Sequence, residues 1–197
     1  MKYNLIVAMC QNNGIGYKGV IPWHLKADLK YFSKLTKGKG KNALVMGNNT
    51  WQSLPSINSM VKGLPGRDNF ILSKSGSNFD MLHNCERLIK TFKTIDELEV
   101  FFSRNGNGNG NGNGNGNVKA MYEEIWIIGG AQIYNQFLLR ESINKCYITY
   151  IDKEFNCDTF FPVLEPSDWL EVERKSEYDT GYACKVDYVV YEKVRLG

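Results

Sequence analysis

Short apolar runs alternate with segments of helical periodicity along this chain, and this alternation restricts the fold more than any other feature. The runs at residues 3–10, 43–46, 69–72 and 124–128 have the length and composition of buried strands. Residues 25–35, between the first two runs, follow a helical pattern. Such alternation is typical of an α/β fold with a mainly parallel sheet.

The remaining elements extend this pattern to the end of the chain. Thr94 and Glu97 have the spacing of a capping box, which predicts the start of a helix that runs through Phe102. A further helix is expected at residues 131–139, and further strands are expected at residues 88–92, 145–152, 170–178 and 184–194. The last two strands should pair antiparallel around a turn at residues 179–181. We therefore predict a single α/β domain over residues 1–197, with a mainly parallel central sheet, an antiparallel C-terminal edge and flanking helices.

Residues 105–117 consist of strictly alternating asparagine and glycine. One Asn-Gly pair suits a tight turn, but a long run of such pairs has no apolar side chain to bury. We expect this tract to be a flexible surface insertion within the domain, without a catalytic role.

The composition limits the possible partners. The 197 residues, 43% of them hydrophobic, are enough for one sizeable core, and the net charge of +3 is too small to indicate nucleic-acid binding. A cluster of lysines contains Lys34, Lys37, Lys39 and Lys41. The simpler interpretation is a solvated turn, and the alternative is a positive surface that attracts a small anionic substrate. The first apolar run is too short to cross a membrane and no signal peptide is visible, so we expect a cytoplasmic protein without a membrane partner.

The five cysteines are scattered without a CxxC pair, and only His24 and His83 add imidazole groups. This pattern lacks the ligand spacing of a zinc site. We expect reduced thiols and no metal.

A carboxylate interrupts the apolar stripe of the first helical segment, which contains Leu25, Asp28, Leu29, Phe32 and Leu35. A buried carboxylate is costly unless it is paired, and no basic residue shares the stripe. Asp28 is therefore expected to face a ligand that brings its own hydrogen-bond donors. The alternative is a structural acid in the first helical turn that interacts with the helix dipole and with local backbone amides.

Residues 14–19 match the spacing G-x-G-x-x-G that binds dinucleotides in Rossmann folds. In that fingerprint the helix begins within the glycines, whereas Pro22 here disfavours a helical conformation at Ile21. The acidic residue expected about 20 positions later is missing as well. We interpret residues 14–21 as a mobile lid instead.

Short motifs that follow one order along nearly the whole chain resemble dihydrofolate reductases. They are Ile15-Gly16, Pro22-Trp23, Ala27-Asp28-Leu29, Phe32, Val45-Met46-Gly47, Thr50-Trp51, Leu64-Pro65-Gly66-Arg67, Ile71-Leu72-Ser73, Ile128-Gly129-Gly130, Tyr134 and Asp158-Thr159. The resemblance implies 7,8-dihydrofolate as the substrate, NADPH as the hydride donor and antifolates as inhibitors.

On the substrate side, the resemblance makes Asp28 the polar anchor of the pterin, which favours protonation of N5 as hydride reaches C6. Thr149 is implied to hold Asp28 in place, and Trp23 is implied to anchor a water. The residues implied to bind the rest of the substrate are Leu29, Phe32, Leu54, Leu64, Arg67 and Ile128. Arg67 would bind the carboxylate of the glutamate tail. Without the resemblance, an exposed turn arginine is the favoured interpretation of this residue.

On the cofactor side, the resemblance implies phosphate binding at two glycine-containing junctions between a strand and a helix. Ser73 and Lys74 would hold the adenosine 2′-phosphate, which favours NADPH over NADH. The full implied set is Ala8, Ile15, Gly16, Gly47, Asn48, Asn49, Thr50, Leu72, Ser73, Lys74, Gly129, Gly130, Ala131, Gln132, Ile133 and Tyr134.

Three residues depart from the family pattern on this side. Asn48 stands where many relatives carry arginine or lysine, Gln132 stands where the residue is often basic, and Ala131 replaces a frequent third glycine. We expect weaker cofactor binding or a weaker preference for NADPH, with no comparable loss on the substrate side.

Two rival functions stay open at this point. One is a pyrimidine reductase of riboflavin synthesis, which shares the fold and the use of NADPH. The other is a non-catalytic folate- or nucleotide-binding protein of the same fold. A longer parent in which this chain is fused to, or associated with, thymidylate synthase also stays open.

Overall fold

A computed structural model describes residues 2–58, 61–75, 87–104 and 121–194. The chain forms two units: unit 1 is Thr36–Trp126, and unit 2 combines Lys2–Leu35 with Ile127–Gly197. The Asn-Gly tract at residues 105–117 lies outside the described residues, as do His83 and Cys85.

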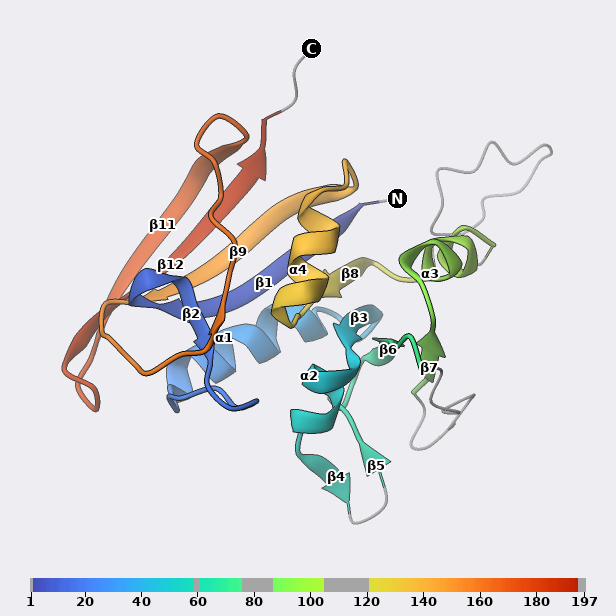
Figure 1. Cartoon of the computed structure of the whole chain (residues 1–197), viewed down its shortest axis with the longest axis horizontal. Helices are drawn as coiled ribbons and strands as arrows, with labels where there is room; N and C mark the ends of the chain where they lie inside the picture. Colours follow the sequence, from blue (N-terminus) through green and yellow to red (C-terminus); the bar gives the residue numbers. More distant parts are fainter. Residues whose placement is uncertain (1, 59–60, 76–86, 105–120, 195–197) are drawn as a thin grey trace. The chain divides into compact units, whose positions relative to one another are not determined.

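Unit 2 contains strands in the order β11-β12-β9-β1 (Figure 1). Their bounds are β1 (Tyr3–Cys10), β9 (Ile143–Ile151), β11 (Trp169–Asp179) and β12 (Cys184–Lys193). Strands β1 and β9 run parallel, whereas β12 pairs antiparallel with both β9 and β11. The predicted antiparallel C-terminal pair next to a parallel strand pair is confirmed.

Helix α4 and the start of α1 also belong to unit 2, together with three short elements. These are α1 (Lys26–Lys37), α4 (Ala131–Leu138), the 3-10 turn η1 (Gln11–Asn13), β2 (Gly14–Gly16) and β10 (Thr159–Phe160). The rings of Tyr3 on β1 and Phe137 on α4 meet edge to face, with their centroids 5.1 Å apart. This contact joins α4 to the sheet through fully buried aromatic surface.

Unit 1 contains strands in the order β8-β3-β6-β7. Their bounds are β3 (Asn42–Gly47), β6 (Asp68–Leu72), β7 (Ile89–Phe92) and β8 (Glu124–Ile127), whose last residue belongs to unit 2. Strand β6 runs parallel to both β3 and β7. The other elements are α2 (Asn48–Ser53), β4 (Ser56–Asn58), β5 (Val61–Lys62) and α3 (Ile95–Phe102). Both units combine parallel strands with helices, which confirms the predicted α/β fold class.

An aromatic cluster forms the core of unit 1. The ring of Phe70 on β6 lies 5.0 Å from that of Phe102, 5.8 Å from that of Tyr122 and 6.1 Å from that of Phe92. Because these residues come from β6, α3, β7 and the segment before β8, the cluster holds distant parts of the sequence together.

Helix α3 begins as the sequence predicts. The hydroxyl of Thr94 accepts a hydrogen bond from the backbone N–H of Glu97 at 3.1 Å. The carboxylate of Glu97 accepts one from the backbone N–H of Lys93 at 2.9 Å. The first bond satisfies a backbone donor that the helix itself leaves without a partner, and the second ties the residue before the cap to the first helical turn.

The helix implied after Gly47 is observed as α2, whereas the sequence did not predict the short elements η1, β2, β4, β5 and β10. Elements of a few residues are too short to display periodicity, so tertiary contacts decide their conformation. Within the described ranges, each helix falls short of the length and apolar character needed to cross a membrane.

Candidate active site

Asp28 and Thr149 form the polar centre of unit 2. Asp28 lies in the first turn of α1, and its carboxylate is hydrogen-bonded to the side chain of Thr149 on β9. Burial raises the pKa of Asp28 above its usual value, and the hydrogen bond with Thr149 opposes part of this shift. The partner is a side chain from a distant strand, which argues against a purely local role at the helix terminus.

The sheet register explains why Thr149 stands next to this acid. Thr149 pairs with Ala8 of β1 on one side and with Tyr188 of β12 on the other. Its side chain is 1% exposed, so the hydroxyl needs a partner inside the protein. The half-buried Ala8, one of the residues implied to bind the cofactor, therefore lies beside the residue that holds Asp28.

Aromatic side chains surround this centre. The rings of Tyr31 and Tyr188 lie 4.6 Å apart, and the buried Trp23 packs on Phe155 with ring centroids 5.3 Å apart. Burial and the nearby charge of Asp28 raise the pKa of Tyr188 to about 12, so its phenol is neutral at physiological pH. Sequence reasoning missed Tyr31 and Tyr188, because only the register of β12 against β9 brings Tyr188 to this centre.

The apolar stripe of α1 is less buried than predicted. Leu29 is 48% exposed, Phe32 and Leu35 are half-buried, and Thr36 is the buried residue of the helix. The expectation that the whole stripe faces the core is therefore wrong for Leu29. An exposed leucine next to a half-buried phenylalanine offers apolar surface to a ligand.

Arg67 is buried in unit 1, and the alternative of an exposed turn arginine is wrong. Its side chain is 2% exposed, and its guanidinium donates to the hydroxyl of Thr36 and to the carbonyl of Pro65. Burial lowers the pKa of Arg67 to about 10, which leaves it charged at neutral pH. A buried, charged fork of donors suits a carboxylate ligand.

Asn69 positions the turn that carries Leu64 and Arg67, and sequence reasoning missed it. Its amide oxygen accepts a hydrogen bond from the Leu64 N–H at 3.1 Å. Its amide nitrogen donates to the carbonyls of Leu64 and Arg67, at 3.2 and 2.8 Å. Leu64 itself is half-buried, as is Leu54, which follows α2. The buried Ile128, also predicted on the substrate side, follows β8 in unit 2.

The junction of β3 and α2 in unit 1 carries the first group of predicted cofactor residues. Gly47 is the N-cap of α2, and Asn48, Asn49 and Thr50 form its first turn. Thr50 is half-buried and Asn49 is exposed. The buried side-chain oxygen of Asn48 has no hydrogen-bond partner among the described residues.

The end of β6 carries the second group. Leu72 and Ser73 are buried, and Lys74 is exposed. The Ser73 N–H donates to the carbonyl of Phe92 at 2.9 Å, and the Ser73 and Ser75 hydroxyls lie 3.1 Å apart. Lys74 thus presents its charge to solvent from a firmly held strand end.

Gly129 and Gly130 connect β8 to α4 in unit 2 and are joined by a cis peptide bond. Gly129 has φ +103, and a Cβ on it would lie 2.9 Å from the ring of Tyr134, so no other residue fits. Tyr134 is buried, and its hydroxyl donates to the Ile6 carbonyl at 2.8 Å. The other predicted residues of this turn differ in burial: Ala131 is half-buried, Gln132 is exposed and Ile133 is buried.

The segment predicted to be a lid has a paired base and a tight tip. Strand β2 pairs antiparallel with β10, and Tyr17 and Val20 exchange backbone hydrogen bonds of 2.9 and 3.1 Å. Ile15 and Gly16 on β2 are half-buried. The Lys18 N–H donates to the Asp158 carboxylate at 2.8 Å, which helps to keep the pKa of Asp158 low. The mobility of residues 14–21 stays a prediction.

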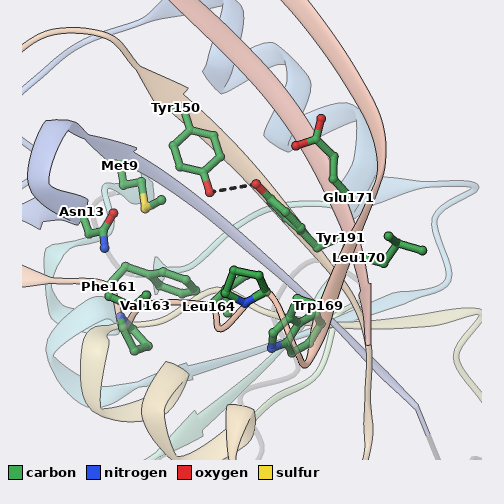
Figure 2. A pocket seen from close by; sticks show the side chains of 12 residues that line it. Met9, Asn13, Tyr150, Phe161, Val163, Leu164, Trp169, Leu170, Glu171 and Tyr191 are labelled. Atoms are coloured by element: carbon green, nitrogen blue, oxygen red, sulfur yellow. Dashed lines mark hydrogen bonds between the residues drawn. The ribbon is translucent and has the colours of Figure 1, made fainter. Parts of the chain in front are cut away.

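A cavity of about 430 Å³ lies elsewhere in unit 2 (Figure 2). Its lining includes Tyr150 and Tyr191, whose hydroxyls lie 3.2 Å apart, but none of the predicted site residues. Neighbouring residues of a strand point to opposite faces, so Tyr150 faces away from the side that presents Thr149. Glu171, a carboxylate of the lining, is paired with Arg174 at 2.7 Å. We therefore place the candidate chemistry at Asp28 and not in this cavity.

In the described part of the chain, no three side chains of His, Cys, Asp or Glu gather as a metal-binding group.

A family model described as dihydrofolate reductase matches residues 2–193. The chain belongs to the dihydrofolate reductase family. It is 32% identical to dihydrofolate reductase of Drosophila melanogaster and 31% identical to that of Aedes albopictus, over 98% of this chain and 98% of each relative. It is also 34% identical to the bifunctional dihydrofolate reductase-thymidylate synthase of Daucus carota, over 95% of this chain and 33% of that protein.

Membership of the dihydrofolate reductase family makes this chain an oxidoreductase that uses a nicotinamide cofactor. The resemblance noted in the sequence is thereby confirmed.

Proposed function

We propose that this protein reduces 7,8-dihydrofolate to 5,6,7,8-tetrahydrofolate with NADPH. The observation that carries the proposal is the Asp28 carboxylate, which is hydrogen-bonded to Thr149 and lies near Tyr31 and Tyr188. The family resemblance assigns this residue the role of the pterin-binding acid. The match to dihydrofolate reductases over residues 2–193 supports it.

Asp28 is proposed to orient the pterin and to favour its protonation. An anionic carboxylate accepts hydrogen bonds from the pterin's ring nitrogen and exocyclic amino group, and these bonds strengthen as positive charge develops on the ring. The reaction adds a hydride to C6 and a proton to N5. We propose that Trp23 anchors the water through which the proton arrives, while Thr149 keeps the carboxylate in one rotamer.

Apolar surface and one cation are proposed to bind the rest of the folate. Leu29, Phe32, Leu54, Leu64 and Ile128 are assigned to the pterin and benzoyl portions. The buried guanidinium of Arg67 is assigned to the glutamate carboxylate, because a planar guanidinium suits bidentate recognition of a carboxylate.

NADPH supplies the hydride when it is bound. The close approach of Gly129 to Tyr134 leaves room for backbone only, which suits a site where the main chain contacts a phosphate. The residues assigned to the cofactor are Ala8, Ile15, Gly16, Gly47, Asn48, Asn49, Thr50, Leu72, Ser73, Lys74 and residues 129–134. Asn48 and Gln132 bring no charge, so we infer that Lys74 supplies most of the preference for NADPH.

Residues 1–197 are proposed to act as one reductase domain, because the family match includes residues of both units. The match to bifunctional plant proteins supports an equivalence with their reductase portion. A cytoplasmic location is supported by the free thiols of Cys10, Cys146, Cys157 and Cys184.

The test is the loss of NADPH absorbance with dihydrofolate as substrate, for the wild type and for Asp28→Asn. At neutral pH the variant should lose about 10² to 10⁴ in turnover while its fold is retained. Asp168→Asn removes an exposed acid of unit 2 and serves as the matched control. Equal turnover of wild type and Asp28→Asn would contradict the role of Asp28, and better turnover of a ribosylated pyrimidine than of dihydrofolate would favour the rival reductase.

A further inference from the structure

Cys10 and Cys157 bring two thiols together in unit 2, outside the residues assigned to substrate or cofactor. Their Sγ atoms lie 3.6 Å apart, although the two residues are 147 positions apart in the sequence. Both are free thiols. A disulfide requires a separation of about 2.05 Å, so the two sulfurs need to approach by roughly 1.5 Å.

The chain on the Cys157 side permits this approach. Cys10 is the buried last residue of β1 and is fixed by the sheet. Cys157 is half-buried and lies in residues 152–158, which form neither helix nor strand. A shift of this segment therefore breaks no backbone ladder of the main sheet.

The thiol pair lies directly against strand β2. A Cβ on Gly14 would lie 2.5 Å from the Cys157 sulfur and 2.8 Å from the Cys10 sulfur. The backbone of Gly16 hydrogen-bonds Cys157, and the Asp158 N–H donates to the Gly16 carbonyl at 3.0 Å. The position of Cys157 is thus coupled to both glycines of β2, which form the base of the segment at residues 14–21.

We propose that Cys10 and Cys157 form a reversible dithiol–disulfide site that restrains strand β2 when it is oxidised. The oxidant is a low-molecular-weight disulfide such as glutathione disulfide. The more accessible Cys157 attacks as a thiolate, the disulfide breaks, and one thiol leaves, so that a mixed disulfide remains on Cys157. Cys10 then loses its proton and attacks the Cys157 sulfur, which forms the Cys10–Cys157 bond and releases the second thiol. Two protein thiols are oxidised and one small disulfide is reduced to two thiols.

The surroundings of Cys157 make this a slow site. Burial and the hydrogen bond with Cys10 raise the pKa of Cys157 to about 11. The neighbouring Asp158 carboxylate adds to the shift, and the backbone hydrogen bond of Gly16 opposes it. Since the thiolate is the nucleophile, exchange speeds up as the pH rises toward that value. The pair therefore becomes oxidised when the ratio of small disulfide to small thiol stays high for a long time, and not when this ratio rises briefly.

The experiment equilibrates the purified full chain in glutathione buffers that range from fully reduced to fully oxidised. Peptide mapping by mass spectrometry then looks for a peptide linked through Cys10 and Cys157. Hydrogen exchange is measured at the amides of Asp158 and Phe161, which donate to the carbonyls of Gly16 and Asn13 and so report on the opening of β2. On oxidation, exchange at these amides should slow by roughly tenfold, and a reducing agent should restore it.

Two variants distinguish the effect of a Cys10–Cys157 disulfide from the effects of oxidising other thiols. Cys157→Ser should abolish both the linked peptide and the slower exchange, whereas Cys146→Ser, which changes a buried thiol of β9, should retain both. Cys157→Ala replaces the serine variant if that variant folds poorly. Absence of the Cys10–Cys157 peptide in fully oxidised buffer overturns the proposal, as does a linked protein whose Asp158 and Phe161 amides exchange at the unlinked rate. These readouts do not involve turnover, so they are independent of the proposed reductase activity.

Discussion

The carboxylate of Asp28 on helix α1 is hydrogen-bonded to Thr149, a fully buried residue of strand β9. Burial of the carboxylate and this hydrogen bond act on the pKa of Asp28 in opposite directions, and burial has the larger effect. The protein thus holds an acid in a position that costs stability, and Thr149 offsets part of that cost.

Thr149→Val should weaken the proposed catalysis without changing the shape of the side chain. A hydrogen bond to a charged group contributes about 1.5 to 3 kcal/mol, so kcat/KM should fall by roughly tenfold or more. The pKa of Asp28 should rise further, which moves the apparent pKa in the pH profile of kcat/KM upward. Thr91→Val is the matched control, because the buried hydroxyl of Thr91 has no partner in the described structure. Identical pH profiles for wild type and Thr149→Val would contradict this role.

Asp28→Asn should stabilise the protein at neutral pH even as it removes activity. The pKa of Asp28 in the folded protein is raised above its ordinary value of 3.8. The stability that comes from the neutral carboxyl group is therefore fully present below pH 3.8, and it is lost as the pH rises through the folded-state pKa. The variant should therefore have the larger free energy of unfolding in urea at pH 7, with a difference that shrinks toward pH 4. Asp187→Asn should show the opposite sign. Burial is the largest single influence on the pKa of Asp187 and raises it, but the hydrogen bonds from Ser176 and Lys185, together with the charges of Lys185 and Arg174, outweigh burial and lower this pKa. A destabilised Asp28→Asn at pH 7 would show that this acid has a mainly structural role.

The long elements were predictable because their periodicity arises from burial itself. Strand β1 was predicted at its observed bounds, and the Thr94 cap of α3 was predicted from the spacing of two residues. Asp28 was identified for the same reason, since a carboxylate on an apolar helical stripe departs from the pattern that burial imposes.

The contacts of the site were less predictable, because they depend on which distant segments meet. Tyr188 reaches Thr149 only through the register of β12 against β9. The residues next to Arg67 in the sequence are typical of an exposed turn. Arg67 is buried because it donates a hydrogen bond to the hydroxyl of Thr36 and because Asn69 fixes the turn that carries it. The sequence around a residue does not indicate which distant residues will contact it in the fold.

Arg67→Lys should raise the KM for dihydrofolate while kcat changes little. An ammonium keeps the charge but loses the planar fork that allows bidentate binding, so we expect roughly a tenfold increase in KM. The control changes the substrate instead of the protein. A dihydropterin without the glutamate tail should be turned over equally by the wild type and by Arg67→Lys. An equal loss with both substrates would mean that the substitution acts through the fold around Thr36.

Lys74→Ala should narrow the preference for NADPH over NADH. Removing one charge-assisted contact with the 2′-phosphate, about 1.5 to 3 kcal/mol, should lower the ratio of the two kcat/KM values by roughly tenfold. Lys93→Ala removes another exposed lysine of unit 1 and should leave the ratio unchanged. An unaltered ratio in Lys74→Ala would remove this residue from the cofactor assignment.

Asn48→Arg should widen the same preference, because it adds the positive charge that the family resemblance leads us to expect at this position. The buried side-chain oxygen of Asn48 has no partner in the described structure, so replacing Asn48 costs no hydrogen bond at that atom. If position 48 faces the phosphates of the cofactor, the KM for NADPH should fall by up to about tenfold, with a smaller effect on NADH, and added salt should reduce the gain. Thermal unfolding of the variant without cofactor separates this effect from a change in stability. A gain that is equal for NADPH and NADH would place the new charge near the phosphates that both cofactors share and not near the 2′-phosphate.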